Sequence, residues 1–324
     1  MIHASLQESD IRRLVGAPGG GGRLVRGIST LDEAADFCLH FINREVTAPL
    51  RERFAALRGC IVIAPRGAAG AGDWGDCVVL EDGAPRAAMG RVLRFVRAEG
   101  LHEPLVRERV VAPSAVISPL AVLDGCVEIG EGVLIEPFCF IGPDVRIGSG
   151  AIVRSGVRLF PRVDVGAHSI IGTNSVLGHD GYGFVRDEAG NKTRLPHLGG
   201  VVIGSSAEVG VLSVVQAGLI NPTVVEDHAK VGDHIFIGHN ARIGRGASVV
   251  AGVAIGGRGV VEAEAWVGLN SSIRDGARVG ARALIGMDVS VQEDVPADAC
   301  ARAPRPDVRP RGETDPGGIG FGSR

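Results

Sequence analysis

The stretch VEDHAKVGDHIFIGHNARI, residues 225–243, carries an aliphatic residue at every sixth position. The same period of six holds without a miss over two runs of the chain. The positions are Val111, Ile117, Leu123, Ile129, Ile135, Ile141, Ile147, Val153, Leu159, Val165, Ile171 and Leu177, then Val225, Val231, Ile237, Ile243, Val249, Ile255, Val261, Val267, Ile273, Val279, Ile285 and Val291. Helices have a period of 3.6 and strands a period of 2, so neither explains the pattern. A strict hexapeptide period is typical of a parallel β-helix.

Each hexad predicts one short strand and the turn that follows it. Three hexads close a triangular coil of eighteen residues, and coils stack about 4.8 Å apart by parallel pairing. Glycine often follows the inward aliphatic residue, as at Gly148 and Gly238, because it tolerates close backbone approach and positive φ. The 49 glycines and the 4% aromatic content agree with a stacked solenoid of small inward residues. The fold class is therefore mainly β, a parallel β-helix.

Composition limits the other possibilities. A chain of 324 residues can hold two domains, and a net charge of −3 implies no general attraction to nucleic acid or to an anionic membrane. There is no long apolar run and no charged-then-apolar leader, so we expect a soluble cytoplasmic protein without membrane insertion. The six cysteines form no CxxC pair, which favours reduced thiols over disulfides or zinc ligands.

Four segments are predicted along the chain. They are a flexible lead-in at 1–22, a small N-terminal α/β domain at 23–107, the β-helix at 108–296 with a loop at 179–200, and a flexible tail at 297–324. Within the α/β domain we expect helices at 31–40, 48–57 and 86–98 and strands at 60–64 and 77–80. A second, smaller interruption of the period lies at 217–223. Interruptions of a solenoid are loops, and loops carry binding functions more often than repeats do.

Three segments together resemble the UDP-3-O-acylglucosamine N-acyltransferases of lipid A biosynthesis, within the hexapeptide-repeat acyltransferases. They are HDGYGF at 179–184, LPHLGGVVIG at 195–204 and IGHNARIG at 237–244. The segment GISTLDEAA at 27–35 is similar to the entry of that family's uridine-binding domain. The resemblance covers roughly residues 24–296. It implies a left-handed β-helix, a homotrimer with sites between neighbouring helices, and acyl transfer from a thioester to an amino group of a sugar or sugar-nucleotide.

The resemblance implies that His239 is the general base that deprotonates the attacking amine, a task that suits a neutral imidazole. It also implies that the Gly257 N–H stabilises the oxyanion. Independently, Gly257 lies eighteen residues after His239, so its backbone stacks about 5 Å from the base. An acyl thioester, on acyl carrier protein or coenzyme A, is the co-substrate, and neither a metal nor a redox cofactor is expected.

The candidate substrate-binding residues are Asn43, His179, Asp180, Tyr182, Phe184 and Asn240. His179 and Asp180 are candidates for acceptor or acyl contact, although an Asp-Gly pair is also an ordinary turn signal. Tyr182 and Phe184 either wall an acyl or acceptor pocket or anchor the loop. His168 and His197 are predicted to be structural.

The chain departs from the family at several positions. His40 and Val46 stand where the family has the aromatic residues that flank an Asn and stack on uracil, while Asn43 keeps that Asn. The segment VQAG at 215–218 replaces an Ile-Asp-Arg-Gly loop, and the family's second histidine is missing from 270–277. The long helix that contacts acyl carrier protein is replaced by the tail after Ala297. These differences make a changed donor or acceptor the leading hypothesis.

Three other interpretations stay open. One is a short-chain N- or O-acetyltransferase that uses acetyl-CoA. Another is a zinc enzyme similar to the hexapeptide carbonic anhydrases, because His234 and His239 have their five-residue spacing. His228 and His234 lie one hexad apart, however, which places them on different faces of one prism. The third is a non-catalytic binding scaffold.

Overall fold

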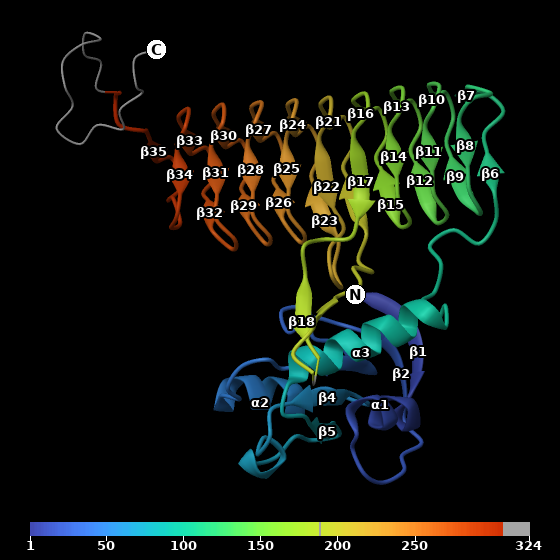
Figure 1. The fold of residues 1–324 in the computed structure, drawn as a ribbon, viewed down its shortest axis with the longest axis vertical. Coiled ribbons are helices and arrows are strands. Elements are labelled where there is room, and N and C mark those ends of the chain that lie inside the picture. Colours follow the sequence, from blue (N-terminus) through green and yellow to red (C-terminus); the bar gives the residue numbers. More distant parts are fainter. Residues whose placement is uncertain (188, 307–324) are drawn as a thin grey trace, which may run out of the picture.

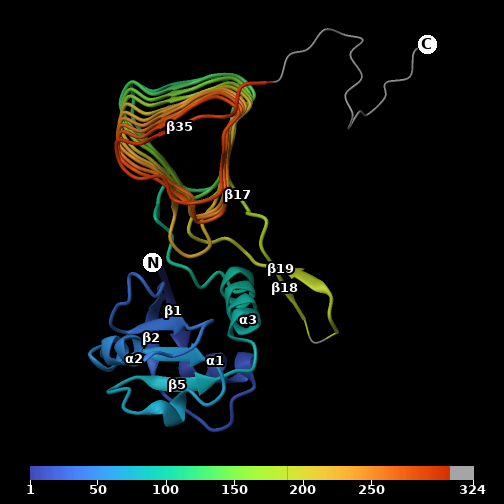
Figure 2. The ribbon, with the colours of Figure 1, turned by 90° about the vertical axis from the view of Figure 1, so that its left-hand side faces the viewer.

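The strands of the hexapeptide region stack into three flat parallel sheets that close a triangular prism (Figures 1 and 2). The computed structural model describes residues 1–187 and 189–306. Each strand pairs in register with the strand one coil away, as Ile237 of β25 (Phe236–Ile237) pairs with Ile255 of β28 (Ala254–Ile255). The parallel β-helix of the left-handed hexapeptide class, with a small N-terminal domain, is therefore confirmed.

The three sheets contain ten, nine and nine strands among the described residues. The first comprises β7 (Val116–Ile117), β10 (Leu134–Ile135), β13 (Ile152–Val153), β16 (Ile170–Ile171), β21 (Glu208–Val209), β24 (Lys230–Val231), β27 (Ser248–Val249), β30 (Trp266–Val267), β33 (Leu284–Ile285) and β35 (Cys300–Ala301). The second comprises β8 (Val122–Leu123), β11 (Phe140–Ile141), β14 (Arg158–Leu159), β17 (Val176–His179), β22 (Val214–Gln216), β25, β28, β31 (Ser272–Ile273) and β34 (Ser290–Val291). The third comprises β6 (Val110–Val111), β9 (Val127–Ile129), β12 (Val145–Ile147), β15 (Val163–Val165), β20 (Val201–Ile203), β23 (Thr223–Val225), β26 (Arg242–Ile243), β29 (Val260–Val261) and β32 (Arg278–Val279).

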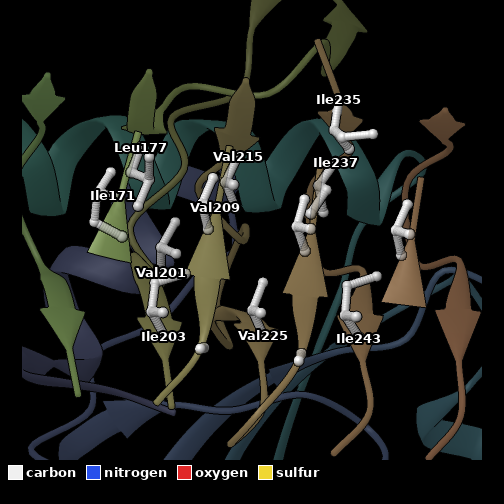
Figure 3. Close-up of a cluster of buried hydrophobic side chains, with 14 of the residues drawn as sticks. Ile171, Leu177, Val201, Ile203, Val209, Val215, Val225, Ile235, Ile237 and Ile243 are labelled. Atoms are coloured by element: carbon white, nitrogen blue, oxygen red, sulfur yellow. The ribbon is translucent and has the colours of Figure 1, made fainter. Parts of the chain in front are cut away.

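The aliphatic residues of the six-residue period fill the inside of the prism. Figure 3 shows Val215, Ile237 and Ile243 among them, pointing into the core, and all three are fully buried. Burying such a side chain contributes about 1.5–3 kcal/mol relative to leaving it in water. Because each coil adds three of these residues, the β-helix has a continuous core along its length.

The backbone conformation at the corners of the prism corrects the expectation that glycines directly after the inward residue adopt positive φ. On most coils the third residue after the inward aliphatic residue has positive φ, as at Asn174 (58°) and Asn240 (58°). Glycines directly after the inward residue, such as Gly148, are not in that region but are closely stacked. A Cβ on Gly148 would lie 2.6 Å from the backbone nitrogen of Ala167. These glycines therefore serve close approach, whereas positive φ falls two residues later.

The N-terminal domain is a five-stranded sheet with helices packed on it. Its strands, in spatial order, are β1 (Ile2–Gln7), β2 (Leu24–Ile28), β3 (Cys38–Phe41), β4 (Ile61–Ala64) and β5 (Val78–Glu81). Its helices are α1 (Glu8–Val15), α2 (Ala48–Ala55) and α3 (Pro85–Ala98), with a short 3₁₀ turn, η1 (Ala69–Ala71). The expected helices at 48–57 and 86–98 and strands at 60–64 and 77–80 are confirmed within a few residues.

Two expectations for this domain are wrong. Residues 1–22 are not a lead-in, because β1 is the edge strand of the sheet and Ile2, Leu6 and Ile11 are buried in the core. The segment 31–40 is not a helix. Thr30 caps only a turn, accepting from the Glu33 N–H at 3.4 Å, and all four residues of β3 are buried in the sheet. Pairing with β2 and β4 therefore overrides the local capping signal.

The loop at 179–200 contains a hairpin, β18 (Phe184–Arg186) and β19 (Lys192–Arg194), that leaves the β-helix and packs against α3 (Figures 1 and 2). Val185, Leu195, Leu198 and Ile220 join the core of the N-terminal domain. The two interruptions of the period thus attach the domain to the β-helix.

The C-terminal boundary also differs from expectation. The β-helix extends past residue 296, because β35 pairs with β33. The rest of the expected tail, 307–324, lies outside the described residues. No described helix is both long and apolar enough to cross a membrane.

Candidate functional site

His239, Gly257 and Asp275 form a column along one corner of the β-helix. Each is the second residue after the inward residue of its strand, and the three strands β25, β28 and β31 are neighbours in one sheet. The eighteen-residue spacing stacks the three residues on successive coils. His239 is half-buried and Gly257 is buried.

The imidazole of His239 lies directly against Gly257. A Cβ on Gly257 would be 2.8 Å from Nε2 and 2.9 Å from Cε1 of His239. Any larger residue at 257 would therefore displace the ring. The predicted stacking of His239 on the Gly257 backbone is present in the structure.

Asn240 orients His239. Its Oδ1 accepts from the backbone N–H of Leu219 at 3.0 Å, and its Nδ2 donates to the carbonyl of Asn221 at 2.6 Å. Because these bonds fix Oδ1 as the acceptor, His239 Nδ1, 3.3 Å away, must be the protonated nitrogen. Nε2, on the Gly257 side, then carries the lone pair. Asn240 therefore holds the 217–223 loop and sets this tautomer, and its role in substrate binding stays a prediction.

Two carboxylates that are close to His239 in the sequence, Asp233 and Glu226, bind backbone N–H groups at other corners. Asp233 caps the N–H of Val211 at 2.7 Å, and Glu226 caps the N–H of Arg245 at 2.9 Å.

The backbone N–H of Gly257 is not free in this structure. It donates to Oδ1 of Asp275 at 2.8 Å. Asp275 thus accepts from a backbone N–H on the neighbouring coil, as Asp233 does from Val211 at a corner on the adjacent face. An oxyanion role for Gly257 requires this carboxylate to move.

A second histidine, His197, lies against His239, with ring centroids 5.2 Å apart. It is 6% exposed, and its Nδ1 donates to the carbonyl of Leu195 at 3.0 Å. Burial, and then the neighbouring His239, lower the pKa of His197 to about 4, so the ring is neutral near pH 7. A Cβ on Gly181 would lie 2.6 Å from His197 Nε2 and 3.0 Å from His239 Cβ, so glycine allows the two rings to approach.

The prediction that His197 is structural did not include this contact, because no period relates the loop to the β-helix. The position of LPHLGG at the return of an interruption was the only available signal.

Asp180 fixes the loop that carries His197. It forms a bidentate ion pair with Arg97 of α3, at 2.9 and 2.8 Å, and accepts from the His197 N–H at 3.1 Å. Arg97 also donates to the carbonyl of His197 at 3.0 Å. Burial alone would raise the pKa of Asp180, but the bonds from Arg97 and the His197 backbone lower it overall. Asp180 is therefore an ionised anchor of the loop.

A pocket of about 900 Å³ is lined in part by this loop. Its walls are the corners of the earlier coils, the 102–107 linker and the loop, including His179, Asp180 and His197. His239 does not line it, so His197 belongs to the wall between the pocket and the His239 side.

The other predicted binding residues lie apart from this pocket. Tyr182 is 78% exposed and contacts Phe184, with ring centroids 5.1 Å apart, and neither lines the pocket. Asn43 is exposed after β3. His40 is fully buried, edge-on to Phe54 at 5.0 Å, so it presents no surface for stacking a base.

The remaining histidines have the geometry of corner residues. His168, His228 and His234 have φ of 59°, 61° and 56°, the position that Asn occupies on other coils. Within residues 1–187 and 189–306, no three His, Cys, Asp or Glu side chains are placed to hold a metal ion.

The fold defines a hexapeptide-repeat β-helix, and the bacterial transferase hexapeptide (six repeats) family matches residues 126–161. More particularly, the chain is 33% identical over 96 residues to UDP-3-O-acylglucosamine N-acyltransferase 2 of Legionella pneumophila, 28% of each chain. It is 35% identical over 63 residues to the UDP-3-O-acylglucosamine N-acyltransferase of Coxiella burnetii, 19% of this chain and 18% of that protein. The predicted resemblance is confirmed over these stretches, which span less than a third of the curated relatives.

Solved structures agree on the fold. UDP-N-acetylglucosamine acyltransferase of Francisella novicida matches with a TM-score of 0.50 at 24% identity, covering 60% of this chain and 67% of that chain. UDP-N-acetylglucosamine O-acyltransferase of Moraxella catarrhalis matches with a TM-score of 0.50 at 17% identity, covering 60% and 71%.

Proposed function

We propose that the protein transfers an acyl group from a thioester to an amino group of a sugar or sugar-nucleotide, with His239 as the general base. The observation that carries this proposal is the oriented imidazole of His239, with its Nε2 lone pair beside Gly257. The relatives named as N-acyltransferases support the reaction class.

In the proposed step, Nε2 of His239 accepts a proton from the attacking amine as nitrogen bonds to the thioester carbonyl carbon. Asn240 holds the opposite nitrogen as a donor, which keeps Nε2 available and stabilises the imidazolium that forms. Collapse of the tetrahedral intermediate breaks the C–S bond, and the proton on His239 passes to the leaving thiolate. The products are an amide and a free thiol.

The developing oxyanion needs a fixed N–H donor. The Gly257 N–H is proposed for this role once Asp275 turns away, since a carboxylate and an oxyanion cannot share one donor. The neutral His197 beside His239 adds no positive charge to the site.

The donor is proposed to be acyl carrier protein or acyl-CoA and the active species a homotrimer. The buried His40 argues against the stacked-uracil mode of acceptor binding. An acetyl-CoA-dependent N- or O-acetyltransferase is the alternative, and it would use the same His239 chemistry.

A thiol-release assay tests the proposal. Acetyl-CoA, a longer acyl-CoA and acylated carrier protein would each be offered with UDP-glucosamine-type and other aminosugar acceptors. Turnover should fall at least about a hundredfold in His239→Ala, as loss of a general base gives. His168→Ala, at an exposed corner away from the column, is the matched control and should keep wild-type activity. Equal rates in His239→Ala, or no turnover with any pair, would overturn the proposal.

A further inference from the structure

The pocket beside the loop has charged and apolar lining residues that take no part in the proposed proton transfer. Four arginines and two aspartates line it, together with Val106, Phe160 and Leu198 and several prolines. Its volume of about 900 Å³ is within the range of cavities that hold drug-sized ligands.

The two aspartates neutralise only two of the arginines. Asp180 pairs with Arg97 at 2.8 Å, and Asp144 pairs with Arg162 at 3.3 Å. The pocket is therefore left with the positive charges of Arg107 and Arg194.

These two arginines have donors to spare. The nearest described carboxylate to Arg107 is Glu103, at 3.9 Å, and both side chains are more than half exposed, so the pair is weak. Arg194 donates to the carbonyl of Gly181 at 3.0 Å and lies over the ring of Phe184, with no ion pair to a described carboxylate. Guanidinium groups with free donors bind phosphate and carboxylate oxygens in bidentate fashion.

Two further nitrogen atoms of lining residues have no hydrogen-bond partner among the described residues. Nδ1 of His102 and Nε of Arg162 are buried without a hydrogen-bond partner within the described part of the chain. Native proteins rarely leave such groups unpaired, and because a guanidinium N–H can only donate, the wall has at least one donor, Nε of Arg162, without an acceptor in residues 1–187 and 189–306.

We propose that this pocket binds an anionic amphiphile, a ligand with a phosphate or carboxylate head and an apolar tail. The head would contact Arg107 and Arg194, and the tail would lie against Phe160, Val106 and Leu198. The proposal does not depend on acyl transfer, because His239, Gly257 and Asp275 do not line the pocket.

Isothermal titration calorimetry on the full chain would test it with octyl phosphate, octanoate, octyltrimethylammonium and inorganic phosphate. We expect at least one octyl anion to bind at one site per chain. The tighter of the two identifies the head group. Inorganic phosphate should bind at least tenfold more weakly, because it has no tail, and octyltrimethylammonium should not compete.

The double variant Arg107→Gln and Arg194→Gln should weaken binding of the anion at least tenfold. Both side chains are exposed, so the variant should fold, as its thermal midpoint would verify. Phe160→Ala should weaken the octyl anions but not inorganic phosphate. Arg278→Gln, on a distant coil, is the matched control and should bind as wild type. Absence of binding by both anions, equal binding of the cation, or full affinity in the double variant would each overturn the proposal.

Discussion

At the scale of single residues, the site depends on which hydrogen bonds its groups already make. His239 suits the proposed role of general base because Asn240 occupies one ring nitrogen and leaves the other facing Gly257. The Gly257 N–H, by contrast, is already bonded to Asp275. The first arrangement prepares the base for proton transfer, and the second requires a side-chain movement before the oxyanion can be stabilised.

Asn240→Ala should lower kcat by about ten- to a hundredfold while leaving the KM for the acyl donor nearly unchanged. The substitution removes the acceptor that fixes the His239 tautomer and leaves the Leu219 N–H and the Asn221 carbonyl unpaired. Steady-state kinetics on the variant would measure both constants. Wild-type kcat would show that His239 does not need this orientation.

Asp275→Ala should raise kcat/KM up to about tenfold, because it frees the Gly257 N–H and removes a negative charge from beside the forming oxyanion. The matched control is Asp233→Ala, which frees the equivalent N–H of Val211 at a corner without a base. A loss of activity confined to Asp275→Ala would mean that the carboxylate takes part in the reaction.

Sequence spacing predicted part of this site for a physical reason. The stacking of His239 on Gly257 follows from eighteen residues per coil, so it could be predicted without coordinates. The bond from Gly257 to Asp275 depends on a side-chain rotamer, which spacing does not determine. The contact of His197 with His239 crosses from a loop to the β-helix, where no period applies.

At the scale of elements, the strands of the β-helix could be predicted from the sequence period, whereas part of the N-terminal domain could not. The hexads predicted strand positions throughout the β-helix because inward side chains and turns repeat together. In the N-terminal domain, the capping signal at Thr30 suggested a helix, but sheet pairing of β3 with β2 and β4 decided the outcome. Tertiary pairing overrides weak local propensity in short segments.

The loop that carries His197 should make stability depend on pH. The pKa of His197 is lowered to about 4 in the folded state, so the unfolded chain binds a proton as pH falls below about 6.5 while the folded chain does not. This contribution leaves stability unchanged above that value and lowers it progressively down to pH 4, by about 3 kcal/mol at most. His197→Gln should therefore lose less stability than wild type between pH 6.5 and 4. Thermal or denaturant unfolding across this range would measure the difference, and parallel curves would contradict it.

At the scale of the whole molecule, outward apolar side chains support assembly. Trp266 and Leu284 lie side by side on the paired strands β30 and β33 and are 50% and 44% exposed, and Met287 nearby is 63% exposed. Exposed apolar groups that adjoin one another are typical of protein contact surfaces.

Light scattering coupled to size exclusion should give three times the mass of one chain for the wild type. Trp266→Glu should shift the mass toward that of a single chain, because a carboxylate at a packed contact is costly to bury. Lys230→Glu, an exposed change on the same sheet, is the control and should leave the mass unchanged. A monomeric wild type would contradict the trimer.

Because each described strand of the β-helix pairs only with strands of the coils directly above and below it, length is a modular property of this molecule. Insertion or deletion of eighteen residues beyond Asp275 preserves the face on which every earlier side chain lies. A change of six residues between His239 and Gly257 would instead move the glycine to another face of the prism. Homologous chains can thus differ in whole coils at the far end and still present the same three-residue column, whereas the interval 239–275 admits no change in length.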